Sequence, residues 1–395
     1  MFTIQILDNL SPQALKLFQA PRYTIGADFD NPDVILVRSR KLHDFSFLTQ
    51  LKAVGRAGVG TDNIPVASLT KLGVPVFYAP GANANAVKEL VLAAMLIGYR
   101  RLDEARMFLT HLSENDKEGL SREIELQKKK FVGHEIAGKT LGVIGLGNIG
   151  VKVANSALAL GMNVIAYDPH MTLPNALALM PSVETVVDMN TLLSKADIIT
   201  LHVPLTADTT HLINEHNIQH IKNHALLLNF SREQVVNETA IIDQLNNQHL
   251  LGYITDFPTP NLANHPKVLS FPHLGASTTE AEAKSAEMVI RNLCNYLEFG
   301  IIEHSINFPD TFLPLTRMPD CRRIVIINLN KPGVIAHVTQ KISQLGYNIE
   351  RMVNTSRDNI AVNLIDISGN NGPEDVLVKS FESIDSVIRV HSIDF

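Results

Sequence analysis

Short apolar runs alternate with helical patterns in the N-terminal part of the chain. Residues 3–7, 34–37 and 74–77 form compact apolar runs, whereas residues 11–18 and 66–72 repeat apolar positions at helical spacing. Strands that alternate with helices usually pair in parallel, with the helices covering the faces of the sheet. The first part of the chain is therefore predicted to be a small α/β domain.

A second series of strands and helices follows a helical region. Residues 86–99 predict a long apolar helix, and residues 102–130 predict a more polar helical stretch that connects two domains. A strand, a glycine turn and a helix are then predicted over residues 141–160, with further strands over residues 163–167, 198–202, 225–229 and 252–255. A helix over residues 279–299 would return the chain to the first domain and make that domain discontinuous.

The C-terminal pattern differs from the rest. After a proline-containing linker it predicts a strand, a helix, two strands, a helix and a last strand, over residues 323–329, 334–345, 348–354, 361–367, 374–382 and 387–392. This βαββαβ order is that of a small ferredoxin-like module. The predicted domains are residues 1–95 with 275–305, residues 96–274, a linker over residues 306–321 and the module over residues 322–395.

Composition limits the class of protein. The 395 residues are 45% apolar and 19% charged, which fits a folded protein of two or three domains. The net charge of −6, with no long basic stripe, argues against nucleic acid as a partner. Cys294 and Cys321 match no metal spacing and no disulfide framework, so we expect no metal and a reducing cytoplasm. No signal peptide and no run long enough to cross a bilayer is expected.

The glycine turn after residue 144 has the sequence pattern of a dinucleotide site. Gly145, Gly147 and Gly150 permit a tight turn, close approach of a pyrophosphate and close helix packing, with Asn148 and Ile149 lining the turn. The N-terminus of the following helix would present backbone N–H groups to the phosphates. The turn lies between a predicted strand and a predicted helix. This context favours a Rossmann-type site.

Asp168 ends the next predicted strand at the distance expected for a ribose-binding acid. Its carboxylate would accept hydrogen bonds from the ribose hydroxyls and repel the extra phosphate of NADP. The sequence therefore predicts NAD as the cofactor. The alternative is a glycine-rich turn in another kind of α/β protein, with Asp168 as a surface residue.

Two further residues suit the chemistry of an NAD-dependent dehydrogenase. Arg232 follows a predicted strand, where its guanidinium can grip a carboxylate with two parallel hydrogen bonds. His273 lies in a turn of small residues and can exchange a proton near neutral pH. The alternatives are a solvated arginine and a structural histidine, since 15 histidines are present. Position after a strand favours the catalytic interpretation.

These motifs together resemble the D-isomer-specific 2-hydroxyacid dehydrogenase family. The resemblance covers roughly residues 1–305 and rests on residues 145–150, Asp168, 202–205, 229–232 and 272–277. It implies a Rossmann-type NAD domain inserted in a discontinuous flavodoxin-like substrate domain. Residues 37–40 and 55–63 and the C-terminal module, which resembles an ACT domain, are similar to the branch that oxidises D-3-phosphoglycerate to 3-phosphohydroxypyruvate. That reaction is the first step of L-serine biosynthesis.

The resemblance also implies roles for individual residues. Arg232 would bind the substrate carboxylate and carbonyl, and His273 would exchange the proton. The other implied cofactor contacts are His202, Val203, Pro204, Phe230, Ser231, Asp256, Gly275 and Ala276, in addition to Arg232 and His273 themselves. The implied substrate contacts are Arg38, Ser39, Arg56, Ala57, Gly58, Val59 and Asn83.

The sequence departs from the family at the partner of the histidine. The family commonly pairs this histidine with a glutamate, and alignment on Phe257 places Pro260 at the glutamate position. Proline cannot orient an imidazole. Asp256 is the nearest carboxylate in the segment, and it would either replace the glutamate as a catalytic residue or contact the nicotinamide.

The ACT-like module raises the question of regulation. Asn330 and Asn348 match positions that bind the effector in serine-sensitive relatives, and Asn328 stands where one such branch has histidine. The module would either bind L-serine or only pair two chains, so a homodimer or homotetramer is expected. Two other functions stay open: another D-2-hydroxyacid dehydrogenase, acting on 2-hydroxyglutarate or glycerate, and a non-catalytic, corepressor-like protein that senses NAD.

Overall fold

The structure, a computed structural model, describes residues 1–19, 21–45, 47, 49–112, 117–314, 321–369 and 372–394. The chain divides into two compact units, which are described separately. Unit 1 comprises Met1–Asn83 and Thr279–Phe395, and unit 2 comprises Ala84–Thr278. The predicted domain boundary at 95/96 falls inside helix α3 (Ala84–Tyr99), which begins unit 2. Residues 315–320 of the predicted linker, and 113–116 of the predicted helical stretch, lie outside the described residues.

Unit 1 contains a five-stranded parallel sheet. Its strands are β1 (Phe2–Ile6), β2 (Tyr23–Gly26), β3 (Val34–Val37), β4 (Ala53–Arg56) and β5 (Val76–Phe77), and its helices are α1 (Pro12–Leu15), α2 (Val66–Lys71) and α11 (Thr279–Phe299). The strand order β2-β1-β3-β4-β5 is that of a flavodoxin-like sheet. Strand β2 was absent from the sequence prediction because its four residues carry only a short apolar signal.

Helix α11 returns the chain to this sheet, as the sequence predicts. Its apolar face, which includes Val289 and Leu293, packs in the same core as the strands. The helix lies so close to β4 that a Cβ atom at Gly55 would stand 2.7 Å from a methyl group of Val289. Glycine at this position therefore permits the close packing of α11 on the sheet.

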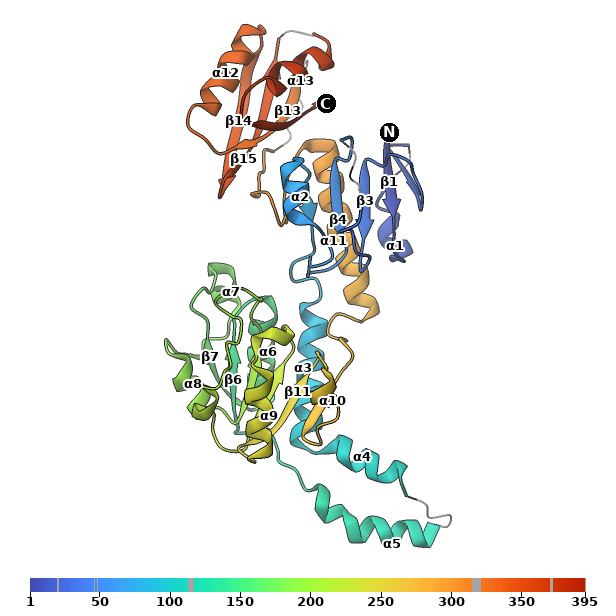
Figure 1. Ribbon diagram of the computed structural model, residues 1–395, viewed down its shortest axis with the longest axis vertical. Coiled ribbons are helices and arrows are strands. Elements are labelled where there is room, and N and C mark those ends of the chain that lie inside the picture. Colours follow the sequence, from blue (N-terminus) through green and yellow to red (C-terminus); the bar gives the residue numbers. More distant parts are fainter. Residues whose placement is uncertain are drawn as a thin grey trace. The chain divides into compact units, whose positions relative to one another are not determined.

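The C-terminal part of unit 1 has the predicted βαββαβ order. It consists of β13 (Cys321–Leu329), α12 (Val334–Gln344), β14 (Asn348–Arg357), β15 (Ile360–Ser368), α13 (Glu374–Glu382) and β16 (Val387–Asp394). The sheet is antiparallel in the order β14-β15-β13-β16. Helices α12 and α13 cover one face through a core that includes Ile324, Val338 and Phe381. Figure 1 shows both helices on this sheet.

The other face of the C-terminal sheet is buried against the rest of unit 1. Ile327, Ile360 and Val362 belong to the same apolar cluster as Phe77 and Leu293. The buried Tyr296 and the half-buried His391 join across this contact, with 2.7 Å between Oη and Nε2. Burial, together with the charges of Arg389 and Lys52, lowers the pKa of His391 to about 3, so the imidazole is neutral.

Arg323 anchors the same contact. Its side chain forms a two-bond ion pair with Asp366, at 2.6 and 3.0 Å, and donates to the carbonyl oxygens of Phe299 and Leu313. Asp366 also accepts from Arg351 at 2.5 Å. A buried charge is stable only when such partners replace water. Arg323 therefore fastens β13 to the end of α11 and to the segment that follows it.

Unit 2 contains a seven-stranded parallel sheet. Its strands are β6 (Thr140–Ile144), β7 (Asn163–Tyr167), β8 (Glu184–Thr185), β9 (Ile198–Leu201), β10 (Ala225–Asn229), β11 (Leu250–Thr255) and β12 (Val268–Ser270). The order β12-β11-β10-β9-β6-β7-β8 is the doubly wound Rossmann arrangement, which reverses between β6 and β9. Ligands bind such sheets at the carboxyl ends of the strands beside this reversal.

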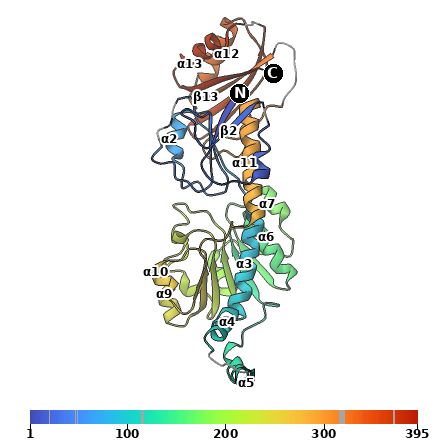
Figure 2. The ribbon, with the colours of Figure 1, turned by 90° about the vertical axis from the view of Figure 1, so that its right-hand side faces the viewer.

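Helices cover both faces of the unit 2 sheet. They are α6 (Asn148–Ala159), α7 (Leu173–Ala178), α8 (Met189–Lys195), α9 (Glu238–Asn246) and α10 (Pro260–Ala263), together with α3 and the 3-10 turns η2 (Ile218–His220) and η3 (Glu233–Val235). Figure 2 shows α3 and α6 on one side and α9 and α10 on the other. Along β10, Leu226 and Leu228 join the α3–α6 core while Leu227 joins the α9 core, so both faces are buried.

The polar helical stretch predicted over residues 102–130 is two helices. These are α4 (Leu102–Thr110) and α5 (Lys117–Gln127), followed by the 3-10 turn η1 (Lys128–Phe131), and all belong to unit 2. Figure 1 shows α4 and α5 leading away from the unit 2 sheet. Neither helix has a buried residue among those described. In the part of the chain that the structure describes, no helix is long and apolar enough to cross a membrane.

Candidate active site

The glycine turn lies at the carboxyl end of β6, where the strand order reverses. Gly145 has a φ of +94°, and a Cβ atom there would lie 2.6 Å from the carbonyl oxygen of His202. A Cβ atom at Gly150 would lie 1.9 Å from the carbonyl oxygen of Gly145. Both positions therefore need glycine. A Cβ atom at Gly147, by contrast, would meet no described atom within 4 Å, so the turn leaves open space in front of α6.

Helix α6 presents its N-terminus to this space. Gly147 is the N-cap residue, so no side chain caps the first turn, which over its described residues also contains no acid. The first N–H groups of a helix lack intrahelical acceptors and attract anions. Asn148 and Ile149 contribute two of them. The open turn and the uncapped helix end together fit the pyrophosphate of a dinucleotide.

Asp168 follows β7 and braces the turn. Its two carboxylate oxygens accept the N–H groups of Leu146 at 2.7 Å and His170 at 2.8 Å. A carboxylate has about four acceptor positions, so each oxygen can accept a further bond from a ribose hydroxyl. Asp168, predicted from the sequence as the ribose-binding acid, thus lies directly beside the glycine turn.

His202, Val203 and Pro204 follow β9 on the other side of the turn. The Val203 side chain would lie 3.0 Å from a Cβ atom at Gly145. The Nε2 atom of His202 lies 3.0 Å from the hydroxyl of Thr200. Burial lowers the pKa of His202 to about 3, so this imidazole is neutral and cannot serve as a proton donor near neutral pH.

A buried network positions the Arg232 loop, which follows β10. The fully buried amide of Asn229 donates to the Arg232 carbonyl at 2.9 Å and to the Tyr253 hydroxyl at 3.2 Å, and it accepts the Ser231 N–H at 3.0 Å. The Ser231 hydroxyl donates to the Leu201 carbonyl at 2.6 Å. Burial raises the pKa of Tyr253 to about 12, so its hydroxyl stays protonated. The Arg232 side chain remains half-buried at the strand edge.

The His273 loop follows β12. His273 has a φ of +56°, in the left-handed region, and its side chain is exposed. The imidazole packs beside Phe257, with 5.0 Å between ring centroids. Phe271 in turn lies near Phe230, with 6.2 Å between centroids. The loop continues through Gly275 and the half-buried Ala276.

Asp256 connects the Arg232 loop to the His273 loop. Its N–H donates to the Asn229 carbonyl at 3.2 Å, and its carboxylate oxygens accept the N–H groups of Leu274 and Gly275, each at 2.7 Å. The side chain is nearly fully buried, and this burial raises the pKa of Asp256 although the hydrogen bonds oppose the shift. Pro260, at the expected glutamate position, begins α10 in the capped first turn. There its missing N–H costs nothing.

Three predicted substrate residues lie at adjacent strand ends in unit 1. Arg38 and Ser39 follow β3, Arg56 ends β4, and Val37 pairs with Arg56 across the two strands. The Arg38 guanidinium forms an ion pair with Glu282 at 2.6 Å. The Arg56 side chain folds over Gly58, where a Cβ atom would lie 1.7 Å from its Nη1 atom. Glycine 58 therefore makes room for the guanidinium.

Asp8 was missed by the sequence prediction, although it follows a strand as Asp168 does. Its Oδ2 atom accepts the N–H groups of Arg38 at 2.7 Å and of Ser39 and Arg40 at 3.2 Å. Burial acts to raise the pKa of Asp8, but these hydrogen bonds outweigh it and hold the pKa below its ordinary value. Asp8 thus fixes the loop that carries Arg38 and Ser39.

The remaining predicted substrate residues surround the same strands. The N–H of Ala57 donates to the Val37 carbonyl at 2.7 Å, and the Gly58 carbonyl accepts the N–H of Ala79 at 2.9 Å. Val59 is half-buried, and Asn83 is the last residue of the N-terminal segment of unit 1.

The predicted effector residues are not brought together within one chain. Asn330 follows the end of β13, next to the start of β15, whereas Asn348 begins β14 and pairs with Ser368 at the end of β15. At about 3.4 Å per residue, they lie on the order of 25 Å apart. Asn328 is buried and accepts from the amide of Asn363 at 2.7 Å. Asn328 is therefore occupied within the sheet.

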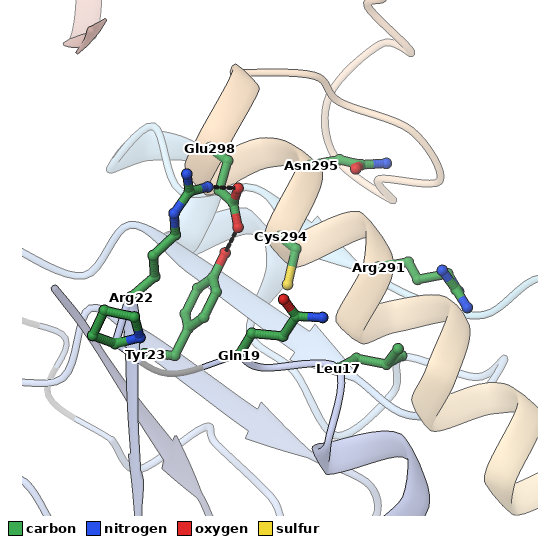
Figure 3. A pocket seen from close by; sticks show the side chains of 9 residues that line it. Leu17, Gln19, Arg22, Tyr23, Arg291, Cys294, Asn295 and Glu298 are labelled. Atoms are coloured by element: carbon green, nitrogen blue, oxygen red, sulfur yellow. Dashed lines mark hydrogen bonds and ion pairs between the residues drawn. The ribbon is translucent and has the colours of Figure 1, made fainter. Parts of the chain in front are cut away.

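A cavity of about 560 Å³ in unit 1 lies away from all these residues. It is lined by Leu17, Gln19, Pro21, Arg22, Tyr23, Arg291, Cys294, Asn295 and Glu298. Figure 3 shows Arg22 and Tyr23 reaching the Glu298 carboxylate, with Cys294 on the same helix. Burial raises the pKa of the Cys294 thiol, which disfavours the reactive thiolate. Among the described residues, no group of three or more His, Cys, Asp or Glu side chains could hold a metal.

Comparisons with known proteins agree with this architecture. Residues 93–275 match the D-isomer specific 2-hydroxyacid dehydrogenase, NAD binding domain. A D-3-phosphoglycerate dehydrogenase of Escherichia coli K12 is 31% identical over 351 residues, covering 86% of this chain and 81% of that protein. One of Methanocaldococcus jannaschii is 38% identical over 329 residues and 78% of this chain. This chain spans only 60% of the length of that relative.

A solved structure shares the fold. It is the NAD⁺-bound 3-phosphoglycerate dehydrogenase of Entamoeba histolytica, with a TM-score of 0.62 and 23% identity over 79% of this chain and 99% of that one. The sequence relationship, the matched NAD-binding domain and the fold agree with each other. The chain belongs to the D-isomer specific 2-hydroxyacid dehydrogenase family.

Proposed function

We propose that this chain oxidises D-3-phosphoglycerate to 3-phosphohydroxypyruvate with NAD as the cofactor. The observation that supports this most directly is the link made by Asp256, which ties the Arg232 loop to the His273 loop at the carboxyl ends of strands in the sheet that carries the glycine turn. A cation for a carboxylate and a group that exchanges protons are the two requirements of 2-hydroxyacid oxidation. Relatives named for this reaction support the same choice of substrate.

The residues of unit 2 fit NAD. The N–H groups at the start of α6 would hold the pyrophosphate, and Asp168 would hold the ribose. The remainder of the cofactor site would be lined by residues that follow β9, β10 and β12 on one side of the turn: His202, Val203, Pro204, Phe230, Ser231, Gly275 and Ala276. When bound, NAD supplies the acceptor for the hydride of the substrate carbon.

Arg232 and His273 would act on the substrate itself. The guanidinium of Arg232 would bind the carboxylate and polarise the oxygen that becomes the carbonyl. The exposed imidazole of His273 would take the proton from the substrate hydroxyl, and it would return that proton in the reverse reaction. His202, whose pKa is lowered to about 3, is unsuited to this role.

Arg38, Ser39 and Arg56 would bind the substrate phosphate. A dianionic phosphate requires several cationic or N–H donors held by the scaffold. Asp8 holds the backbone of residues 38–40, and Gly58 leaves space for the Arg56 guanidinium. Ala57, Gly58, Val59 and Asn83 would form the neighbouring wall of the substrate site.

The function is tested by following NADH absorbance with 3-phosphohydroxypyruvate, hydroxypyruvate and 2-oxoglutarate side by side. We expect the highest kcat/KM with 3-phosphohydroxypyruvate, and at least a hundredfold loss of kcat in His273→Ala. Preference for an unphosphorylated acid would indicate another D-2-hydroxyacid dehydrogenase. NADH binding without turnover of any of the three would indicate an NAD-sensing protein.

We also propose that the chain forms a homodimer or homotetramer in the cytoplasm. Helices α4 and α5 carry apolar side chains that are largely exposed, such as Leu109 at 51% and Leu126 at 66%. Contact with a second chain would remove this surface from water. Binding of L-serine by both Asn330 and Asn348 would likewise need two chains. Light scattering tests the assembly. A parallel rate assay with and without millimolar serine tests the effector separately.

A further inference from the structure

Asp256 makes three of the hydrogen bonds that hold the His273 loop. The N–H of His273 is shared between the carbonyl oxygens of Phe271 at 3.0 Å and Asp256 at 3.2 Å, and the N–H groups of Leu274 and Gly275 donate to Oδ1 and Oδ2 of Asp256, each at 2.7 Å. The side chain of Asp256 is only 2% exposed, so water does not compete for these bonds. The only side chain among these acceptors is the buried Asp256 carboxylate, which fixes the backbone directly after His273.

This support is needed because of the conformation of His273. Its φ of +56° lies in the left-handed region, which is unfavourable for a residue with a side chain. Such a conformation persists only where the surroundings enforce it. The direction of the imidazole therefore depends on the bonds that Asp256 makes.

The imidazole itself is held in another way. Among the described residues, no carboxylate is hydrogen-bonded to the His273 ring, and the ring instead packs on Phe257, which follows Asp256 in the chain. Pro260, where a glutamate was expected, begins α10 and has no acidic group. The carboxylate that holds the loop and the ring that contacts the imidazole thus come from the same short segment, Asp256–Phe257.

We propose that Asp256 is a positioning residue: it aims the His273 imidazole by binding the backbone of the loop, in place of a carboxylate bound to the ring. The inference rests on the proposed role of His273 as the group that exchanges the substrate proton. It extends that proposal, because orientation of the imidazole, which a glutamate at position 260 was expected to provide, is assigned to Asp256 and the loop backbone. In this arrangement the Asp256 carboxylate serves as an acceptor for two backbone N–H groups.

The test compares Asp256→Asn with Asp188→Asn in the full-length chain. An amide can accept only one of the two N–H groups, and its NH₂ group opposes the other. Asp188 is a matched control, because its carboxylate also accepts two N–H groups, those of Asn190 and Thr191, but at the start of α8. We expect kcat to fall about 10- to 100-fold in Asp256→Asn, with NADH affinity nearly unchanged, and to stay unchanged in Asp188→Asn.

The pH profile separates positioning from charge. If Asp256 acts through the backbone, the acid limb of the kcat/KM profile keeps its position in Asp256→Asn while the plateau falls. The ¹⁵N signals of the His273 side chain should broaden or split as the ring loses its fixed direction. A displaced acid limb with an unchanged plateau would show that Asp256 acts on the ring by its charge, and a wild-type profile would show no role at all. Either result overturns the proposal.

A second variant covers the case in which Asp256→Asn does not fold. A Cβ atom at Gly275 would stand 3.1 Å from Oδ2 of Asp256, so Gly275→Ala presses on the carboxylate without removing it. We expect the same loss of kcat, with the acid limb of the kcat/KM profile at its wild-type position. Measuring NADH affinity by fluorescence shows whether the substitution also changes cofactor binding. Unchanged kcat in Gly275→Ala would contradict the proposal. His273→Ala tests the proposed function independently, since retained activity there would remove His273 from the reaction.

Discussion

Arg323 and Asp366 form an ion pair in which neither side chain has any solvent exposure. The pair joins neighbouring strands β13 and β15, and the same guanidinium binds carbonyl oxygens at the end of α11 and beyond it. Removing one partner of a buried pair leaves the other charge without water or a counterion, which typically costs about 3–5 kcal/mol. Arg323→Leu should therefore lower the free energy of unfolding by about this amount, as measured by urea denaturation.

The adjacent arginine supplies the control for this measurement. Arg322 pairs with Asp394 at 2.6 Å, but the Asp394 side chain is 67% exposed. Exposed pairs contribute less than about 1 kcal/mol. Arg322→Leu should thus lose far less stability than Arg323→Leu, and equal losses would show that the buried pair is not the anchor of this contact.

Asp168 should determine both the affinity for NADH and the preference over NADPH. Asp168→Asn removes a charged acceptor from the ribose site and weakens the brace on the Leu146 N–H. A hydrogen bond to a charged group is worth about 1.5–3 kcal/mol, so the ratio of kcat/KM for NADH to that for NADPH should fall about 10- to 100-fold. Steady-state rates with both cofactors test this, and an unchanged ratio would remove Asp168 from the ribose site.

Arg56 should distinguish phosphorylated from unphosphorylated substrates. We expect Arg56→Ala to raise KM for 3-phosphohydroxypyruvate about 10- to 100-fold, because a charge-assisted bond to the phosphate is lost. KM for hydroxypyruvate should change little. Arg291→Ala, which removes an arginine paired with Glu287 on α11, is the control. Equal effects of Arg56→Ala on both substrates would show that Arg56 does not bind the phosphate.

Asp8 should stabilise the protein in a pH-dependent way. Its pKa lies below the ordinary value of 3.8 in the folded chain, so its contribution is fully present above that value and is lost as the pH falls through the folded pKa. Asp8→Asn should cost about 1.5–3 kcal/mol at pH 7. The difference from the wild type should shrink in urea titrations below about pH 3.8.

The exposed Asp30 is the control for Asp8, since Asp30→Asn removes the same charge from the surface of unit 1. A stability difference for Asp8→Asn that persists unchanged at acid pH would mean that the ionised carboxylate is not what holds residues 38–40.

The sequence predicted the features that depend on local pattern. The glycine turn, Asp168 and Arg232 follow predicted strands, and their positions were predictable because a strand and its end are visible in a short window. His273 follows the three-residue strand β12, which was not among the predicted strands. The N–H groups that bind the Asp256 carboxylate were not predictable in this way. This carboxylate binds N–H groups 18 and 19 residues further along the chain, through a loop geometry that follows from the pairing of β11 with β12.

Two other features lay beyond the local pattern for the same reason. Asp8 binds backbone 30 residues away, and only the pairing of β1 with β3 brings the two together. The amides of Asn330 and Asn348 match effector positions by sequence, but the antiparallel register of β15 separates them to opposite ends of the sheet. Contacts that depend on strand register are not contained in the residues of either strand alone.

The shared apolar cluster of unit 1 has a consequence for how the chain unfolds. Ile327, Ile360 and Val362 of the C-terminal sheet are buried with Leu293 of α11, so cutting the chain before β13 would expose both surfaces to water. At about 25 cal/mol per Å² of apolar area, such exposure is costly. Residues 1–83, α11 and the C-terminal sheet should therefore melt together in a single cooperative transition. Any effector bound by the C-terminal sheet would then shift substrate affinity through continuous packing rather than through a flexible tether, and substrate would shift effector affinity by the same factor.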